Sequence, residues 1–140
     1  MPTAIDLFTP QTKKVNLYSD FRKDLLTSPL SEDIVMLRDE DAVKESIKNL
    51  LLTDPGERPM QPFLGGGIRE MLFENMSPAT LKLIKNKVQT TIEVYEPRAE
   101  LIDISVSSQI DDNVVSVQVT FYIRNRQQPI TLDVILERIR

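Results

Sequence analysis

The chain has 140 residues, of which 41% are hydrophobic and 27% charged, and this balance fits one globular domain with a single modest core. Its formal net charge of −4, without a long run of either sign, argues against nucleic acid as the main partner, because phosphate binding needs a basic face. The sequence contains neither cysteine nor histidine, which excludes thiol nucleophiles, disulfides, imidazole bases and most zinc sites.

The sequence shows no targeting or membrane signal. Residues 1–10 lack a basic region followed by an apolar core, so we expect no secretory signal there. No apolar run approaches the ~20 residues that a membrane-spanning helix needs. We therefore expect a soluble protein that stays in the cell that makes it.

Residues 1–32 are expected to form an irregular N-terminal arm, and residues 33–140 a single domain. Val15 and Leu17 alternate with polar neighbours, which predicts a brief strand within the arm. Because disordered tails are poor in aromatic residues, the apolar and aromatic side chains of the arm indicate that it packs on its own domain or on a neighbour. These side chains are Ile5, Leu7, Phe8, Tyr18 and Phe21.

A first helix is predicted from Asp39 to about Leu52, after a short strand at residues 34–37. Asp39 is a candidate N-cap, and the acidic residues that follow it suit the helix dipole. Residues 53–56 form a turn signature, because proline restricts one φ angle and glycine permits a positive one. The apolar stripe of the helix consists of Val43, Ile47, Leu50 and Leu51.

The loop at residues 57–67 contains two prolines and ends in three consecutive glycines, Gly65 to Gly67. A phosphate-binding loop is rejected, because no Lys-Ser/Thr pair follows the glycines and no buried strand precedes them. The glycines instead indicate a close backbone approach or unusual φ angles. A short helix is expected at residues 68–73.

A longer helix is predicted to run from Pro78 to about Tyr95. Ser77 is a good N-cap, and proline is tolerated at the first helical position. Apolar residues recur every three or four positions, which defines one face of the helix. That face consists of Leu81, Ile84, Val88, Ile92 and Tyr95.

The segment Glu96-Pro97-Arg98, which we call the joint, connects this helix to the strands that follow. Pro97 lacks an N–H and disfavours a helical conformation at Glu96, so a bend is expected. Glu96 and Arg98 are two residues apart and project to the same side of an extended chain. The pair is either a surface ion pair at a helix end, worth ~0–1 kcal/mol, or a charged corner presented to a partner.

Three strands are predicted at residues 102–107, 115–123 and 130–137 from alternating apolar and polar residues. The short linkers between them favour antiparallel pairing of neighbours, so the first and third strands become edges that are covered or pair with another chain. The expected fold class is α+β, with helices on one face of a C-terminal three-stranded antiparallel meander. In the first strand the inward residues are expected to be Ile102, Ile104 and Val106.

No pattern of catalytic residues emerges, so we expect no enzyme, no metal and no cofactor. Asp111-Asp112-Asn113 lacks the acid spacing of a calcium loop and is better read as a hairpin turn. The serines lack a histidine base, although a Ser–Lys arrangement stays open. Nothing in the spacing of the carboxylates demands a glycosidase pair. The carboxylates near the loop and the joint are Glu57, Glu70, Glu74, Glu96 and Glu100.

Three stretches, residues 47–59, 63–76 and 95–98, carry a resemblance to a known family. Together and in this order they resemble the baseplate wedge, or sheath-initiator, proteins of contractile phage tails, which include protein W of smaller phages. Glu96-Pro97-Arg98 resembles the hallmark of that family. Relatives belong to the baseplate of the type VI secretion machine. The resemblance covers roughly residues 34–124.

The resemblance implies a structural, non-catalytic role. It implies that the joint docks on a helical core bundle of larger wedge proteins, and that the strands initiate the tail sheath by strand exchange with the sheath protein. No nucleic acid, membrane or small-molecule partner is implied. The implied location is the tail baseplate of the virion, with the host cytoplasm during assembly. The residues expected to bind the partner are Glu96, Pro97, Arg98, Arg58, Pro59 and Phe63.

Three alternatives stay open. The chain could be a cytosolic adaptor of the same fold that binds a regulatory partner, or a baseplate component of a type VI secretion system. The third alternative is an acidic muramidase, since some relatives carry a lysozyme-like label, but the residues here give that label little support.

Overall fold

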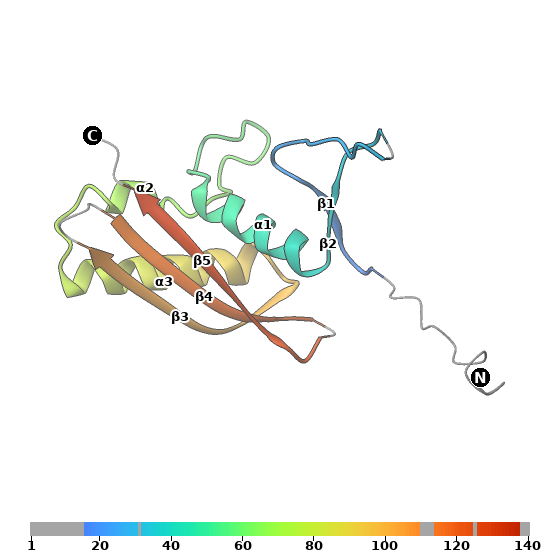
Figure 1. The fold of residues 1–140 in the computed structure, drawn as a ribbon. Helices are drawn as coiled ribbons and strands as arrows, with labels where there is room; N and C mark the ends of the chain where they lie inside the picture. Colours follow the sequence, from blue (N-terminus) through green and yellow to red (C-terminus); the bar gives the residue numbers. More distant parts are fainter. Residues whose placement is uncertain (1–15, 31, 110–113, 125, 138–140) are drawn as a thin grey trace.

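A computed structural model describes residues 16–30, 32–109, 114–124 and 126–137 (Figure 1). Strands β3, β4 and β5 form an antiparallel meander, and β1 pairs with β2 in a separate two-stranded sheet. The predicted α+β class with a C-terminal three-stranded sheet is confirmed. The elements are β1 (Ser19–Phe21), β2 (Met36–Arg38), α1 (Glu40–Leu52), α2 (Ile68–Met71), α3 (Pro78–Tyr95), β3 (Ala99–Gln109), β4 (Val114–Ile123) and β5 (Pro129–Glu137).

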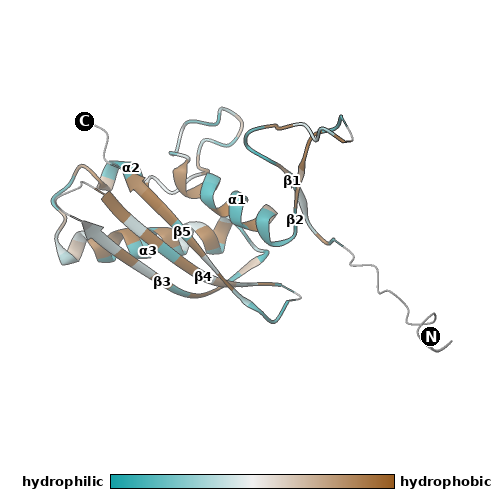
Figure 2. Cartoon of the chain, in the orientation of Figure 1, coloured by the Kyte–Doolittle hydropathy of each residue, from teal (hydrophilic) through white to brown (hydrophobic). Residues whose placement is uncertain are grey.

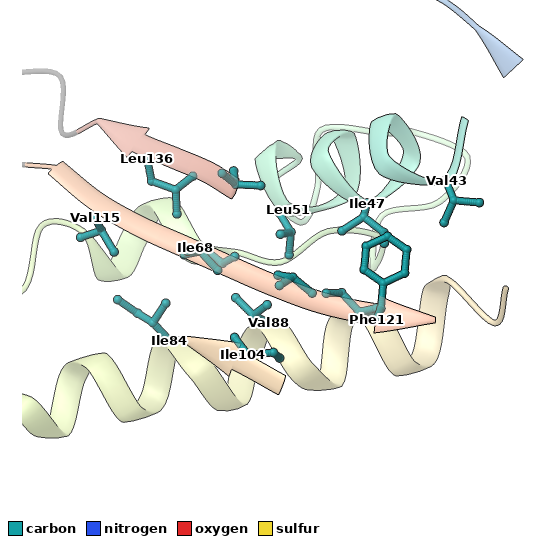
Figure 3. Close-up of a cluster of buried hydrophobic side chains, with 14 of the residues drawn as sticks. Val43, Ile47, Leu51, Ile68, Ile84, Val88, Ile104, Val115, Phe121 and Leu136 are labelled. Carbon is teal, nitrogen blue, oxygen red and sulfur yellow. The ribbon is translucent and has the colours of Figure 1, made fainter. Parts of the chain in front are cut away.

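The core lies between one face of the meander and the helices (Figure 3). Every second residue of β4 from Val115 to Ile123 is buried, as the alternating pattern predicts. Each fully buried aliphatic or aromatic side chain contributes about 1.5–3 kcal/mol to folding. In Figure 2 the strands β4 and β5 are mostly brown, whereas the loop that joins them is largely teal. The helix residues packed on the sheet include Val43, Ile47, Leu51, Ile84, Val88 and Ile92.

The start of β3 departs from the predicted alternation. A β-bulge between Leu101 and Asp103 shifts the register against β4. Because a bulge inserts one extra residue, Ile102 turns outward and is 47% exposed, and Leu101 packs against the core instead. The prediction that Ile102 faces inward is therefore wrong, whereas Ile104 is buried and Val106 packs against the core as expected.

Helix α3 matches its prediction at both ends. The Thr80 N–H donates to the Ser77 hydroxyl oxygen over 3.2 Å, which satisfies one of the otherwise unpaired donors of the first turn. The helix ends at Tyr95, directly before the joint. No helix among the described residues is long and apolar enough to cross a membrane.

The arm contributes a strand, but not at the predicted place. The observed strand β1 begins at Ser19, beyond Leu17, and pairs antiparallel with β2. Tyr18 packs against the core, so this part of the arm lies on its own domain. Val15, Ile5, Leu7 and Phe8 lie outside the described residues, as does the hairpin turn predicted at residues 111–113.

Asp39 precedes α1 as predicted, but its side chain does not cap the helix. The Asp39 Oδ1 atom accepts hydrogen bonds from the backbone N–H groups of Leu17 and Tyr18, at 2.8 and 3.2 Å. Its Oδ2 atom lies 2.6 Å from Nη2 of Arg126. The prediction that the Asp39 side chain caps α1 is therefore wrong, because these long-range partners hold its carboxylate away from the first turn of the helix.

The glycine loop folds back on the end of α1, which confirms the structural reading of the three glycines. Gly65 has a φ of +132° and Gly67 a φ of +56°. A Cβ atom at Gly65 would lie 2.3 Å from the Thr53 carbonyl oxygen, too close for any side chain. The Gly66 N–H donates to the same oxygen over 3.1 Å. The short helix that follows covers residues 68–71, two fewer than expected.

Candidate partner-binding joint

The joint folds into a bidentate ion pair that closes on itself. Nε of Arg98 lies 2.6 Å from Oε1 of Glu96, and Nη2 of Arg98 lies 2.8 Å from Oε2. Ser46, from the middle of α1, donates its hydroxyl hydrogen to Oε2 of Glu96 over 2.6 Å. Pro97 ends the helix between the two charged residues, so both side chains project to one side and meet. Glu96 is therefore held from two sides, by Ser46 of α1 and by Arg98, which directly precedes β3.

Electrostatics keep both residues of the pair charged. Burial by itself raises the pKa of Glu96, but hydrogen bonds from Arg98 and Ser46, with the charge of Arg98, lower it further than burial raises it. The pKa of Glu96 therefore lies below its ordinary value of 4.5. The hydrogen-bonded carboxylate of Glu96 raises the pKa of Arg98, and the charge of Asp20 adds to this effect.

The two charges of the joint differ in what they offer a partner. The side chain of Glu96 is 3% exposed, whereas that of Arg98 is 31% exposed. The two charges of the joint thus pair with each other within this chain. A neighbour that reaches the corner meets the guanidinium of Arg98 and the exposed ring of Pro97, not the carboxylate of Glu96.

Tyr18 contacts the joint, and the sequence did not predict this contact. The Arg98 guanidinium carbon lies 5.4 Å from the centroid of the Tyr18 ring, within the range of a cation–π contact. Tyr18 comes from the arm, 80 positions before Arg98 in the numbering. The aromatic content of the arm indicated that it packs on something, but no local pattern shows where.

The loop between α1 and α2 reaches the joint through Tyr95. The Tyr95 hydroxyl donates to the backbone oxygen of Phe63 over 2.7 Å. Arg58 and Tyr95 line one small cavity together with Ser46, the residue that binds Glu96. Pro59 is exposed in the same loop. The structure therefore brings Arg58 and Phe63 beside the joint.

Exposed apolar side chains distinguish this loop from an ordinary polar turn. Phe63 is 84% exposed and Met60 is 96% exposed. Large exposed apolar groups next to a fixed charge are typical of protein-binding surfaces. Among the described residues, no group of three or more acidic side chains is placed to hold a metal ion. The fold and the site therefore define a small α+β protein with a surface suited to docking on another protein.

The family follows from sequence comparison. Residues 37–128 match the profile of the family described as baseplate wedge protein gp25. This range exceeds half of the chain and contains all three motif stretches, so the chain belongs to that family, and the resemblance is confirmed. The whole arm, residues 1–32, lies outside the matched range.

Known relatives match most of the length of this chain, and the solved structures among them share its fold. The chain is 28% identical over 105 residues to the baseplate wedge protein gp25 of Enterobacteria phage T4, covering 75% of this chain and 79% of that protein. A crystal structure from Geobacter sulfurreducens, of a protein provisionally named a tail lysozyme, has a TM-score of 0.70 at 28% identity, covering 76% of this chain and 97% of that one. A chain of the anti-feeding prophage baseplate has a TM-score of 0.61 at 23% identity, covering 88% of this chain and 87% of that one, which shows a shared fold.

Proposed function

We propose that this protein is a structural subunit of the baseplate wedge of a contractile tail. In this proposal the joint docks on a helical core bundle of larger wedge proteins, and the C-terminal sheet initiates the tail sheath by strand exchange. The protein works in the tail baseplate and is assembled in the host cytoplasm. Residues 33–140 act as one unit, and residues 1–32 are an arm attached to it. The family membership and the baseplate origin of the similar chains support this role.

The observation that carries the docking role is the position of Arg98. Its guanidinium is held by Glu96 in a two-point contact and by the ring of Tyr18, yet part of it stays on the surface. A guanidinium fixed in this way loses little side-chain entropy when it binds. It can donate its remaining N–H groups to carboxylate or carbonyl oxygens of a partner.

The neighbouring loop supplies the apolar part of the same surface. Phe63 and Met60 are the most exposed apolar side chains of this loop, and Arg58 lies beside Tyr95. Aromatic and arginine side chains carry much of the binding energy of protein interfaces. The hydrogen bond from the Tyr95 hydroxyl to the backbone oxygen of Phe63 keeps the loop next to the joint. We infer that Arg58, Pro59 and Phe63 contact the same partner as Arg98.

The sheath role is supported by the two edges of the meander. In the described part of the chain, β3 and β5 each pair with β4 alone. Edge strands carry backbone donors and acceptors that a strand from another chain can use. An open antiparallel sheet is thus able to template a neighbour by strand addition.

The geometry of the joint argues against the muramidase alternative. A glycosidase needs a carboxylic acid with a raised pKa, next to a second carboxylate across a sugar site. Glu96 shows the opposite property, because its pKa is lowered and both of its oxygens are bonded. We therefore propose a non-enzymatic role for this chain. The provisional lysozyme name belongs to the Geobacter sulfurreducens protein and not to this chain.

The docking role is tested with Arg98→Ala in the full-length protein during tail assembly. Ser46→Ala is the matched control, because it removes a hydrogen bond to Glu96 from the α1 side and leaves the exposed guanidinium in place. We expect Arg98→Ala to abolish co-sedimentation with baseplates, whereas Ser46→Ala keeps it. The amount of each variant in purified particles is measured against soluble folded protein. Normal incorporation of Arg98→Ala would show that the joint does not dock.

The same fractionation, applied to the unmodified protein, distinguishes the adaptor alternative from the wedge role. Recovery in tail particles supports the wedge role. Recovery only in a small soluble complex would replace it with the adaptor role.

A further inference from the structure

A first cavity lies at the end of β5 and reaches around its outer edge. It is lined by Ile135, Leu136 and Glu137 of β5, together with Leu72 and Phe73 after α2. Successive residues of a strand point to opposite faces of the sheet. A cavity that touches three successive residues of an edge strand therefore lies beside the strand, where its unpaired backbone groups are. Most of its lining is apolar.

A second cavity follows the same edge toward the start of β5. It touches the successive residues Leu132 and Asp133, so it also lies beside the strand and not over one face. Its other walls come from α1, which contributes the charged side chains of Lys44, Glu45 and Lys48, and from the arm and β2. The arm and β2 contribute Arg22, Lys23, Asp24 and Leu37. The two cavities touch β5 at residues 132–133 and 135–137, which together span about the length of a typical strand, and we call the pair of cavities the trough. The trough is apolar at one end and charged at the other.

The two edges of the meander differ in regularity. The pairing of β5 with β4 runs without interruption from Pro129 to Glu137. The β3 edge is interrupted by the bulge at Leu101 and Asp103, and Asp103 forms an ion pair with Lys85 at 3.5 Å. A third cavity borders the first three residues of β3 but ends at that bulge. Bulges and charged side chains are the features that hinder strand addition at a sheet edge.

We propose that β5, and not β3, is the edge that pairs with a strand of another polypeptide. This inference rests on the proposed function and specifies which part of the sheet performs it. The incoming segment is extended and belongs to a different tail protein. It places apolar side chains beside Ile135 and Phe73 and polar or charged side chains beside Lys44 and Glu45. Backbone hydrogen bonds to β5 supply affinity, and the two ends of the trough set the register.

The register of the sheet provides matched positions for a test. Asp133 of β5 and Ser105 of β3 both pair with Gln118, and Ile135 and Ser107 both pair with Ser116. All four side chains are exposed. A photo-crosslinking phenylalanine analogue is placed at each position in turn in the full-length protein. Purified tails containing each variant are irradiated, and the crosslinked products are identified by mass spectrometry.

We expect positions 133 and 135 to give several-fold more crosslinked product than 105 and 107, with another tail protein as the partner. Equal yields, or higher yields from the β3 positions, would overturn the assignment of the edge while leaving the wedge role intact. A product made of two copies of this chain would overturn the stated partner. Failure of the unmodified protein to sediment with tails would overturn the wedge role itself and this inference with it.

Discussion

Glu96 carries a negative charge at a position that is almost closed to water. An isolated buried carboxylate is costly, but here three hydrogen bonds, two of them from a cation, compensate it. Arg98 therefore has two tasks, because it neutralises Glu96 on its inner side and presents N–H groups on its outer side. A substitution at Arg98 acts on stability and on docking together, which is why Ser46→Ala is needed as a control.

The lowered pKa of Glu96 predicts a loss of stability in acid. A carboxyl group whose pKa is lower in the folded state stabilises the fold above its unfolded pKa, and this contribution disappears as the pH falls through the folded pKa. We expect the urea midpoint of the wild type to fall between about pH 6 and about pH 3. In Glu96→Gln the midpoint should be lower at neutral pH and should fall less on acidification.

Urea unfolding at both pH values measures this difference. Glu137→Gln, at the exposed end of β5, is the control for the general effect of removing a carboxylate. Equal pH dependence in Glu96→Gln and the wild type would contradict the role given to the ion pair.

At the scale of elements, the loop between α1 and α2 depends on glycine where the backbone crosses itself. The Gly65 backbone lies against the Thr53 carbonyl, and Gly56 makes the turn at the other end of the loop with a φ of +94°. Both glycines have a positive φ, but only Gly65 is also packed against backbone that cannot move aside. The loop carries Arg58 and Phe63, so its shape decides where these two side chains lie.

This difference predicts unequal costs for two alanine substitutions. Gly65→Ala should lower the free energy of unfolding by about 2–3 kcal/mol, because it adds a steric clash to backbone strain. Gly56→Ala should cost about 1 kcal/mol, since no heavy atom lies within 4 Å of the added carbon. Chemical denaturation of the two variants measures both values. Equal costs would show that the crossing at Thr53 relaxes easily.

At the scale of the whole molecule, Asp39 links parts of the chain that are far apart in sequence. Its carboxylate holds the arm through the N–H groups of Leu17 and Tyr18, and it binds Arg126, which lies between β4 and β5. Arg126 also contacts Glu40 at 3.1 Å. The Asp39–Arg126 pair thus connects the arm, α1 and the sheet. Since Tyr18 lies on Arg98, this pair also helps to shape the proposed docking surface.

Removing Arg126 should loosen the arm while the core stays folded. In Arg126→Ala the buried carboxylate of Asp39 loses a cation, so we expect the free energy of unfolding to fall by about 1–3 kcal/mol. We also expect faster hydrogen exchange at residues 17–21, with little change in α3 and β4. Mass spectrometry of exchange measures this pattern. Arg124→Ala is the control, because its side chain is exposed near the same turn, and it should leave the arm protected.

Local spacing was enough to predict most of the elements and their pairing. The periods of helix and strand are properties of the backbone, so apolar positions in α1, α3, β4 and β5 show which face is buried. The cap at Ser77 and the strained glycines also depend on a few neighbouring residues, and both were predicted. Because short linkers join the three strands, neighbouring strands were expected to pair in a meander, and the structure confirms this arrangement.

Contacts between distant residues decided the rest. The sequence by itself determined that Glu96 and Arg98 lie on one side of a bend, because they flank a proline. Only the tertiary structure placed Ser46 and Tyr18 beside them, and so turned one charge inward and left the other at the surface. The bulge that exposes Ile102 likewise depends on pairing with β4. No local pattern encodes such contacts, since their free energy appears only when separate elements pack together.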